Sequence, residues 1–123
     1  MFEYIAEKPD SLFLVAEKDE EVVGYIISMD SPLDGVRRIL DLAVEKKHRR
    51  QGIGSLLVRS ILDENKEKVS KIVLEVRPSN LAAIRLYSKF GFKLDRVIPN
   101  YYQDDEDAYL MSRSVDTCVL EVS

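Results

Sequence analysis

Two stretches near the start of the chain combine apolar, β-branched and aromatic residues in runs of strand length. They cover Ser11–Lys18 and Glu21–Asp30, and a short polar turn separates them. Such runs on either side of a tight turn are typical of a β-hairpin. We therefore expect an antiparallel pair of strands, followed by a loop over residues 31–35 and a third strand over residues 36–46.

The period of the apolar residues changes after Gly54, from that of a strand to that of a helix. One face of the expected helix is apolar, with Ile53, Leu56, Leu57, Ile61 and Leu62. The opposite face is charged, with Arg59, Asp63, Lys66 and Glu67. This spacing predicts an amphipathic helix whose apolar side packs on a sheet.

A buried strand and a second helix follow. Residues 71–76 have few polar interruptions, which favours a central strand. Leu81–Phe90 has helical spacing, and Ser79 or Asn80 is suited to its N-cap. Gly91 stands where a glycine often ends a helix. We expect this helix to pack beside the strand that precedes it.

The last expected strands cover residues 92–98 and 107–115. Three strands, a helix, a strand, a helix and two strands make the predicted order of elements. This order predicts a single α/β domain over residues 1–123, with a mixed and mostly antiparallel sheet flanked by helices. In such sheets ligands bind at the carboxyl ends of strands, where the N-termini of helices point.

Composition narrows the classes of function. The chain has 123 residues, a net charge of −4, one cysteine and one histidine. The negative charge argues against nucleic-acid binding, and no apolar run is long enough to span a membrane. The N-terminus lacks the pattern of a signal peptide. A single cysteine fits a reducing cytoplasm and excludes a cysteine-rich zinc site, and the lone His48 builds no metal site by itself.

A basic, glycine-containing loop lies between the third strand and the first helix. His48, Arg49 and Arg50 precede Gly52 and Gly54. The loop fits a solvated surface turn, and it equally fits a cradle for an anion, because helix N-termini present free N–H groups. It lacks the Lys-Ser or Lys-Thr pair of a Walker A loop and the third glycine of a dinucleotide-binding fingerprint.

Three segments resemble one enzyme family. Arg49-x-x-Gly52-x-Gly54 resembles the Q/R-x-x-G-x-G/A loop of the GCN5-related N-acetyltransferases, the GNAT superfamily. Residues 74–93, with Leu-Glu-Val-Arg, Ser-Asn, Ala-Ile-x-Leu-Tyr and Phe-Gly-Phe, resemble its N-terminal protein acetyltransferases, including those of the RimI type. Residues 100–111 resemble the same group in their Tyr-Tyr pair and acidic loop. The resemblance runs from about Leu12 to Arg113.

The resemblance implies a site for acetyl-CoA. Backbone amides of the loop, assisted by its arginines, are expected to hold the pyrophosphate. The backbone of Leu42 and Val44 is expected to pair with the pantetheine arm, Asn80 to contact the cofactor, and Tyr87 to lie near its sulfur. The expected residues of the loop are Arg49, Arg50, Gln51, Gly52, Ile53, Gly54 and Ser55.

The resemblance also implies catalytic roles for two residues, with Glu75 as general base and Tyr87 as proton donor to the thiolate. Amide formation needs a neutral amine and a protonated leaving group, and an α-amino group is easier to deprotonate than a lysine. Taken alone, Glu75 reads as a solvated or ion-paired side chain and Tyr87 as a core residue. Tyr101 and Tyr102 are expected to form a wall for the acceptor or to cap the sheet.

The acidic run Asp104–Asp107 is either solvated or attracts a cationic amine. A route through an acetylated cysteine is not expected, since Cys118 lies in the C-terminal tail without an adjacent base. We expect direct transfer in a ternary complex.

The acceptor side departs from the family pattern. Relatives begin with a helix–loop–helix, whereas here a residual helix over about residues 1–10 is all that precedes the first strand. Three alternatives would then compensate on the acceptor side: a partner subunit, a second copy of the chain, or a groove that stays open. Residues 116–123 are expected to be a tail or an extra strand.

Three functions stay open at this point. The first is acetylation of protein N-terminal α-amino groups, in a ribosomal protein for example. The second is acetylation of a small amine or a lysine side chain, which a short groove would admit. The third is a noncatalytic acetyl-CoA-binding subunit.

Overall fold

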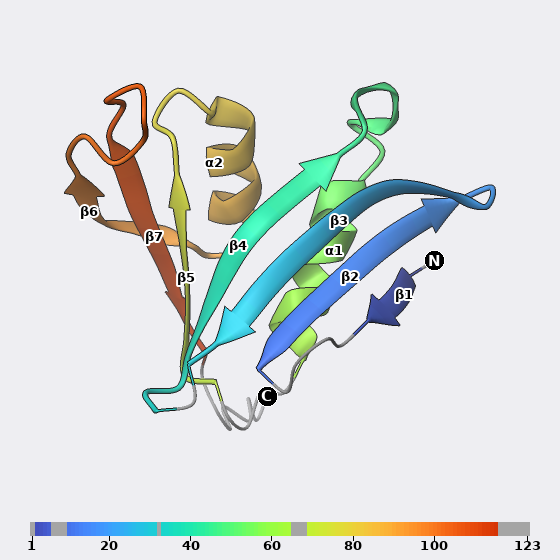
Figure 1. Cartoon of the computed structure of the whole chain (residues 1–123), viewed down its shortest axis with the longest axis horizontal. Helices are drawn as coiled ribbons and strands as arrows, with labels where there is room; N and C mark the ends of the chain where they lie inside the picture. Colours follow the sequence, from blue (N-terminus) through green and yellow to red (C-terminus); the bar gives the residue numbers. More distant parts are fainter. Residues whose placement is uncertain (1, 6–9, 32, 65–68, 116–123) are drawn as a thin grey trace, which may run out of the picture.

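The computed structural model describes residues 2–5, 10–31, 33–64 and 69–115. These residues form a seven-stranded sheet in the order β1-β2-β3-β4-β5-β7-β6, with two helices (Figure 1). The strands are β1 (Phe2–Ile5), β2 (Ser11–Lys18), β3 (Glu21–Asp30), β4 (Val36–Val44), β5 (Lys71–Val76), β6 (Lys93–Ile98) and β7 (Ala108–Ser114). The helices are α1 (Ile53–Asp63) and α2 (Leu81–Lys89), and a 3₁₀ turn covers Lys46–His48.

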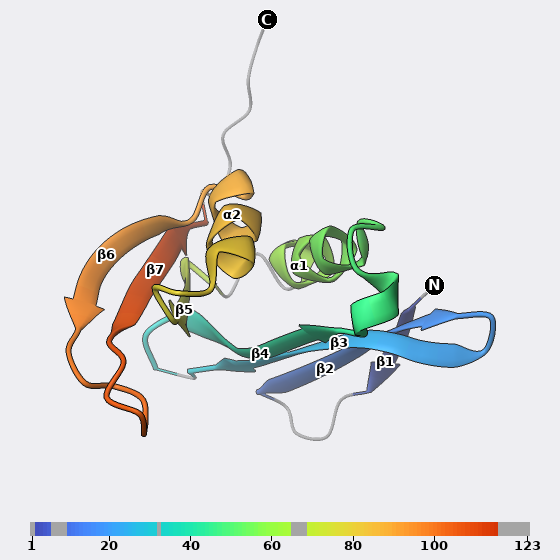
Figure 2. The ribbon, with the colours of Figure 1, turned by 90° about the horizontal axis from the view of Figure 1, so that it is seen from above.

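The sheet is mixed and mostly antiparallel, as the order of elements predicts. β4 and β5 run parallel, and every other neighbouring pair is antiparallel. A parallel pair needs a crossover, and α1 provides it between these two strands. Figure 2 shows both helices on the same side of the curved sheet. We call this side the helix face and the other side the open face.

The expected helix at the N-terminus is wrong for residues 2–5, which form β1. This strand pairs antiparallel with β2, from Phe2 opposite Ala16 to Ile5 opposite Phe13. Four residues are too few for a stable isolated helix, whereas the edge of β2 offers backbone partners for each of them. Residues 6–9 lie outside the described part of the chain, as do the tail at 116–123 and the expected helix residues Lys66 and Glu67.

α1 packs an apolar side on β2, β3 and β4, as expected, but Leu56 was wrongly placed on this side: it is exposed, and Val58 is buried instead. Leu57, Val58 and Ile61 are fully buried in the core. Gly24 on β3 permits the close approach, since a Cβ at this position would lie 2.9 Å from the Ala43 carbonyl oxygen and 3.3 Å from the Ile53 side chain. A larger residue at position 24 would therefore push α1 away from the sheet.

A buried arginine fixes the end of α1. Arg37 on β4 is 2% exposed, and its Nε and Nη2 donate to the two carboxylate oxygens of Asp30 at 2.6 and 2.8 Å. Its Nη1 donates to the carbonyls of Ile61 and Glu64 at 2.9 and 2.7 Å. These carbonyls belong to the end of the helix, where C=O groups lack N–H donors from a following turn. Arg37 thus ties the helix to β3 and β4.

β4 and β5 separate toward their carboxyl ends, as Figure 1 shows. Their pairing begins at Val36 opposite Lys71 and ends at Ile39 opposite Leu74, although β4 continues to Val44. The register between β3 and β4 shifts so that Leu40 has no partner on β3, which is the pattern of a β-bulge. Bulges bend a strand. The bend opens the sheet next to α2.

The ends of α2 follow the signals in its sequence. Asn80 is the N-cap, and its Oδ1 accepts from the Ala83 amide at 3.2 Å. At the other end Gly91 has φ +88°, and the amides of Gly91 and Phe92 donate to the carbonyls of Ser88 and Tyr87. This is a Schellman motif. It brings the buried Phe92 ring against the ring of Tyr87, with centroids 5.5 Å apart.

Candidate functional site

The first cavity of the site lies between the N-terminus of α1 and the side of α2, and we call it the helix-end cleft. Its volume is about 750 Å³. It is lined by Leu42, Val44, Arg49, Arg50, Gly52, Ile53, Gly54, Ser55, Asn80, Ala82, Ala83, Arg85, Leu86 and Lys89. All of the residues expected to hold the cofactor line it except Gln51 and Tyr87. The Gln51 side chain instead accepts from Lys18 Nζ at 2.9 Å.

The N-terminus of α1 presents free backbone donors to this cleft. Gly52 is the N-cap and has φ +80°, in the left-handed region that favours glycine. Within the described part of the chain no side chain caps this helix, and its first turn carries no acidic residue. The amides of the first turn therefore point their donors, with the positive end of the helix dipole, at the cleft.

Gly54 keeps this cradle open. A Cβ at position 54 would lie 3.2 Å from Cδ2 of Leu86 on α2, so a side chain would have to project into the space between the two helices. The unpartnered amides, the glycine and the surrounding cations together fit a diphosphate, which is the anion that helix N-termini commonly bind.

Cationic side chains surround the cradle. Arg49 and Arg50 approach from the loop before α1, and Arg85 and Lys89 approach from α2. Arg49 Nε donates to the Val44 carbonyl at 3.2 Å, and Lys89 Nζ donates to Ser55 Oγ at 2.9 Å. The basic loop therefore lines a concave surface, as a cradle for an anion requires.

The second cavity lies where β4 and β5 separate, and we call it the interstrand cavity. Its volume is about 280 Å³. It is lined by Ile39, Leu40, Asp41, Leu42, Leu74, Glu75, Val76, Arg77, Asn80, Ala83, Tyr87 and Tyr102. The two residues expected to be catalytic, Glu75 and Tyr87, thus border the same space. Glu75 comes from β5 and Tyr87 from α2, so the opening between the strands brings them together.

Tyr87 keeps its proton strongly. Burial raises the pKa of its hydroxyl well above the ordinary value, and the nearby Asp41 carboxylate adds to this shift. Asp41 itself is held in place, because its two oxygens accept from the Tyr25 hydroxyl at 2.8 Å and from the Leu42 amide at 2.9 Å. The pKa of Tyr25 is raised in turn by its hydrogen bond to Asp41. The hydroxyl is therefore protonated at physiological pH, and it can donate a hydrogen bond to a group in this cavity.

The third cavity opens on the open face, and we call it the tyrosine groove. Its volume is about 410 Å³, and it is lined by Arg38, Ile39, Leu40, Glu75, Tyr101 and Tyr102. The rings of Tyr101 and Tyr102 meet edge to face with centroids 4.9 Å apart, and Tyr101 is 48% exposed. An exposed aromatic wall beside a groove is suited to a peptide.

The acidic loop after Tyr102 is bound to the protein. Arg77 Nη1 donates to Asp104 and to Glu106 at 2.8 and 2.9 Å, and its guanidinium lies 4.0 Å from the centre of the Tyr102 ring. Hydrogen bonds from the loop backbone and from Ser79, together with Arg77, lower the pKa of both carboxyl groups. These two carboxylates therefore position Tyr102.

The three cavities adjoin one another in a row, which we call the passage, because each shares lining residues with the next. Leu42, Asn80 and Ala83 line both the helix-end cleft and the interstrand cavity. Ile39, Leu40, Glu75 and Tyr102 line both the interstrand cavity and the tyrosine groove. An anion at the start of α1 and a second molecule on the open face can therefore meet beside Glu75 and Tyr87.

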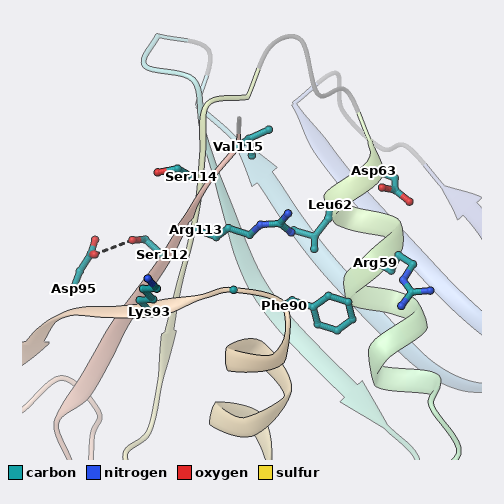
Figure 3. Close-up of a pocket in the computed structure, with 11 residues that line it drawn as sticks. Arg59, Leu62, Asp63, Phe90, Lys93, Asp95, Ser112, Arg113, Ser114 and Val115 are labelled. Carbon is teal, nitrogen blue, oxygen red and sulfur yellow. Dashed lines mark hydrogen bonds between the residues drawn. The ribbon is translucent and has the colours of Figure 1, made fainter. Parts of the chain in front are cut away.

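A fourth pocket, of about 810 Å³, lies apart from this passage (Figure 3). It lies between α1, the start of β6 and the end of β7, and none of its described lining residues lines the other three. Its carboxylate Asp95 already accepts from Ser112 Oγ at 2.8 Å, drawn as a dashed line in the figure, and lies 3.3 Å from Lys71 Nζ.

The model of the acetyltransferase (GNAT) family matches residues 1–92. The chain belongs to the GNAT acetyltransferase family. It is 39% identical over 115 residues to an N-alpha-acetyltransferase of Sulfurisphaera tokodaii, in an alignment that covers 84% of this chain and 69% of the relative. The family accounts for the fold, and this GNAT protein is an acetyltransferase.

Solved structures of GNAT proteins have the same fold. The crystal structure of Ard1 from Thermoplasma volcanium matches with a TM-score of 0.80 and 39% identity, over 85% of this chain and 71% of that one. That of the ribosomal-protein-S18-alanine N-acetyltransferase from Escherichia coli matches with a TM-score of 0.81 and 27% identity, over 95% and 77%. Across the described residues of this GNAT domain, no helix is long and apolar enough to cross a membrane, and no cluster suited to a metal ion is found.

Sequence reasoning missed three charged residues of the site. Arg38 and Asp41 lie on β4, and Arg77 follows β5. A signal was present, because charged residues inside a central strand are rarely buried without a partner. The partners, however, come from other strands, and the local pattern does not identify them.

Proposed function

We propose that this GNAT protein transfers the acetyl group of acetyl-CoA to the N-terminal α-amino group of a protein. The observation that supports it best is the continuous passage from the helix-end cleft to the tyrosine groove, with Glu75 and Tyr87 at its centre. The names of the relatives, N-alpha-acetyltransferase and ribosomal-protein-S18-alanine N-acetyltransferase, point to the same class of acceptor.

The helix-end cleft holds the coenzyme in this proposal. The amides of residues 52–55 bind the diphosphate, with Arg49 and Arg50 beside them. Bound acetyl-CoA supplies the acetyl group as a thioester. The Leu42 amide and the Val44 carbonyl form hydrogen bonds with the pantetheine arm. These replace the bonds that the two groups now form with the Asp41 carboxylate and the Arg49 guanidinium.

Glu75 and Tyr87 move the protons. A carboxylate oxygen of Glu75 takes a proton from the acceptor amine, directly or through a water molecule, which makes the nitrogen a nucleophile. As the new N–C bond forms and the C–S bond breaks, Tyr87 gives its hydroxyl proton to the sulfur, and the second proton lost by the nitrogen returns to the tyrosine oxygen through solvent. The raised pKa of Tyr87 keeps its hydroxyl protonated at neutral pH before the transfer. Transfer is direct, so Cys118, outside the described residues, has no role in it.

A peptide panel tests the proposal. Thiol release from acetyl-CoA is measured with peptides that start with free Ser, Ala or Met, with the same peptides blocked at the N-terminus, and with polyamines. Turnover with the free peptides alone supports the proposal. Turnover with blocked lysine peptides or polyamines contradicts it in favour of a small-amine or lysine acceptor.

A substitution separates binding from chemistry in the same assay. Glu75→Gln keeps the shape of the side chain but removes the base, so kcat is expected to fall about 100-fold or more while acetyl-CoA affinity is unchanged. An unchanged kcat would exclude Glu75 as the base.

A cytoplasmic location and a second subunit that completes the groove remain predictions.

A further inference from the structure

Arg38 and Glu75 meet on the open face of the sheet. Neighbouring residues of a strand point to opposite faces, and Arg37 points to the helix face, where it contacts α1. Arg38 therefore points to the open face. Its register partner on β5 is Val73, and Glu75, two residues further along, shares this face. Arg38 Nη1 and Glu75 Oε2 form an ion pair.

The two partners of this ion pair differ in exposure. The side chain of Glu75 is 14% exposed and that of Arg38 is 44% exposed. A guanidinium carries five N–H donors in a planar fork, and the contacts found in the described part of the chain use Nη1. The remaining donors of Arg38 are therefore available to a molecule in the tyrosine groove, which this residue lines.

The other charges near the groove are already paired. Asp104 and Glu106 are bound by Arg77, on the far side of the Tyr102 ring. Of the residues that line the groove in the described structure, Arg38 carries the single positive charge. The walls beside it, Leu40 and Tyr101, are apolar and about half exposed. The groove thus combines an apolar wall with one guanidinium.

We propose that Arg38 recognises a carboxylate on one of the first two residues of the acceptor and so selects acidic N-termini. The inference rests on the proposed transfer to an N-terminal amine. An acceptor carboxylate binds the guanidinium fork, and Arg38 then releases Oε2 of Glu75. The base gains a free oxygen for the amine proton when an acidic acceptor is bound, so recognition and proton transfer are coupled.

The spacing of residues along a peptide limits which acceptor side chains can reach Arg38. The acceptor amine lies within hydrogen-bond reach of Glu75, directly or through one water, and Arg38 is the direct neighbour of Glu75. Consecutive Cα atoms are about 3.8 Å apart, so side chains beyond the second residue are carried away from Arg38 along the groove.

Matched peptides test the proposal on the full chain. They carry a free N-terminal serine and differ at the second residue, which is Glu, Gln or Lys, and a second pair differs at the first residue, which is Glu or Gln. We expect kcat/KM to be about tenfold higher with Glu than with Gln at one of these positions, and lowest with Lys. This preference should shrink at high salt because the groove is open to solvent.

Variants of Arg38 then assign the preference. In Arg38→Gln the Glu-to-Gln ratio should fall to about one, while Arg38→Lys should keep part of it because the charge remains. In Arg38→Glu the Lys peptide should become the preferred one. Arg59→Gln on α1, which lines the separate fourth pocket, is the matched control and should keep the wild-type ratio.

The outcomes separate this inference from the proposed function. Loss of turnover with every free-amine peptide overturns both. Two results overturn only the recognition of a carboxylate by Arg38 and leave the proposed function standing. One is wild-type turnover without a preference for Glu, and the other is an unchanged preference in Arg38→Gln. An equal fall in kcat for all peptides with the ratio unchanged shows that Arg38 merely positions Glu75. Acetyl-CoA binding and thermal melting of each variant confirm that it is folded.

Discussion

The cavities on the helix face and on the open face of this sheet are built by different means. On the helix face, the cleft is made of backbone amides, two glycines and long cations around them. On the open face, the groove is made of side chains from β4, β5 and the loop after β6, joined by ion pairs. A cleft made of backbone amides is suited to a ligand that all members of a family share, such as a coenzyme. A groove made of side chains is suited to a ligand that differs between members, such as an acceptor.

The difference explains where the family resemblance is strong. A cradle of amides depends on φ angles and on the absence of a Cβ, so glycine spacing encodes it locally. A groove of ion-paired side chains can be altered by single substitutions without loss of the fold. Acceptor specificity is therefore expected to reside in Arg38, Leu40 and Tyr101 and not in the glycine loop.

The largest effect is expected on the helix face, from Gly54→Glu. The new side chain fills the space against Leu86 and brings a negative charge to the place of the diphosphate. Affinity for acetyl-CoA, measured by calorimetry, should fall by more than about 100-fold, since both sterics and charge oppose binding. Arg59→Glu adds a carboxylate further along the same helix and should bind acetyl-CoA nearly as the wild type does. Tight binding by Gly54→Glu would show that the diphosphate lies elsewhere.

Arg37→Met tests what holds the helix face together. The substitution leaves Asp30 and the last carbonyls of α1 without their donor in a buried place. Breaking a buried ion pair in this way typically costs about 3 kcal/mol in the free energy of unfolding. Urea denaturation at neutral pH measures it, and Arg59→Met on the exposed side of α1 serves as control. If the free energy of unfolding falls no more than in the control, the hydrogen bonds of Arg37 contribute little to stability.

Arg37 also shows what the sequence can and cannot predict. The order of elements from β2 onward, the hairpin, the N-cap Asn80 and the Schellman glycine depend on nearby residues, and all were predictable. Arg37 and Arg38 are adjacent and chemically alike in the sequence, yet one is buried beneath α1 and the other faces the groove. Their roles depend on strand parity and on partners in other elements.

The helix predicted for residues 2–5 is the clearest error, and it has a related cause. These four residues were assigned to a helix because relatives begin with one, whereas the edge of β2 decides their conformation. The opening between β4 and β5 was likewise beyond local patterns, because it follows from a bulge in one strand and the end of pairing in the next.

Tyr87→Phe tests the centre of the passage. Removal of the hydroxyl should lower kcat about 100-fold and leave acetyl-CoA affinity unchanged, as expected for a lost proton donor. Tyr25→Phe, which removes the hydroxyl at the other side of Asp41, should cause a much smaller loss. An equal loss in both variants would assign the effect to the Asp41 hydrogen bonds.

The same variant should change stability at high pH. The pKa of Tyr87 is raised in the folded state, so above about pH 10 the unfolded chain releases a proton that the folded chain retains. Tyr87 therefore lowers stability as the pH rises through this range. Chemical denaturation at pH 9 and pH 11 should show a smaller decrease for Tyr87→Phe than for the wild type.

The smallest effect is expected in the acidic loop. The pKa values of Asp104 and Glu106 are lowered from ordinary values of 3.8 and 4.5, chiefly by hydrogen bonds from the loop backbone and from Ser79. Their contribution to stability is therefore complete above the ordinary pKa values and is lost as the pH falls below them.

Arg77→Gln should make Tyr102 more mobile, raise KM for the acceptor a few-fold and leave kcat and the KM for acetyl-CoA unchanged. Acceptor titrations at neutral pH measure this, and a fall in kcat instead would mean that the loop reaches the reacting groups.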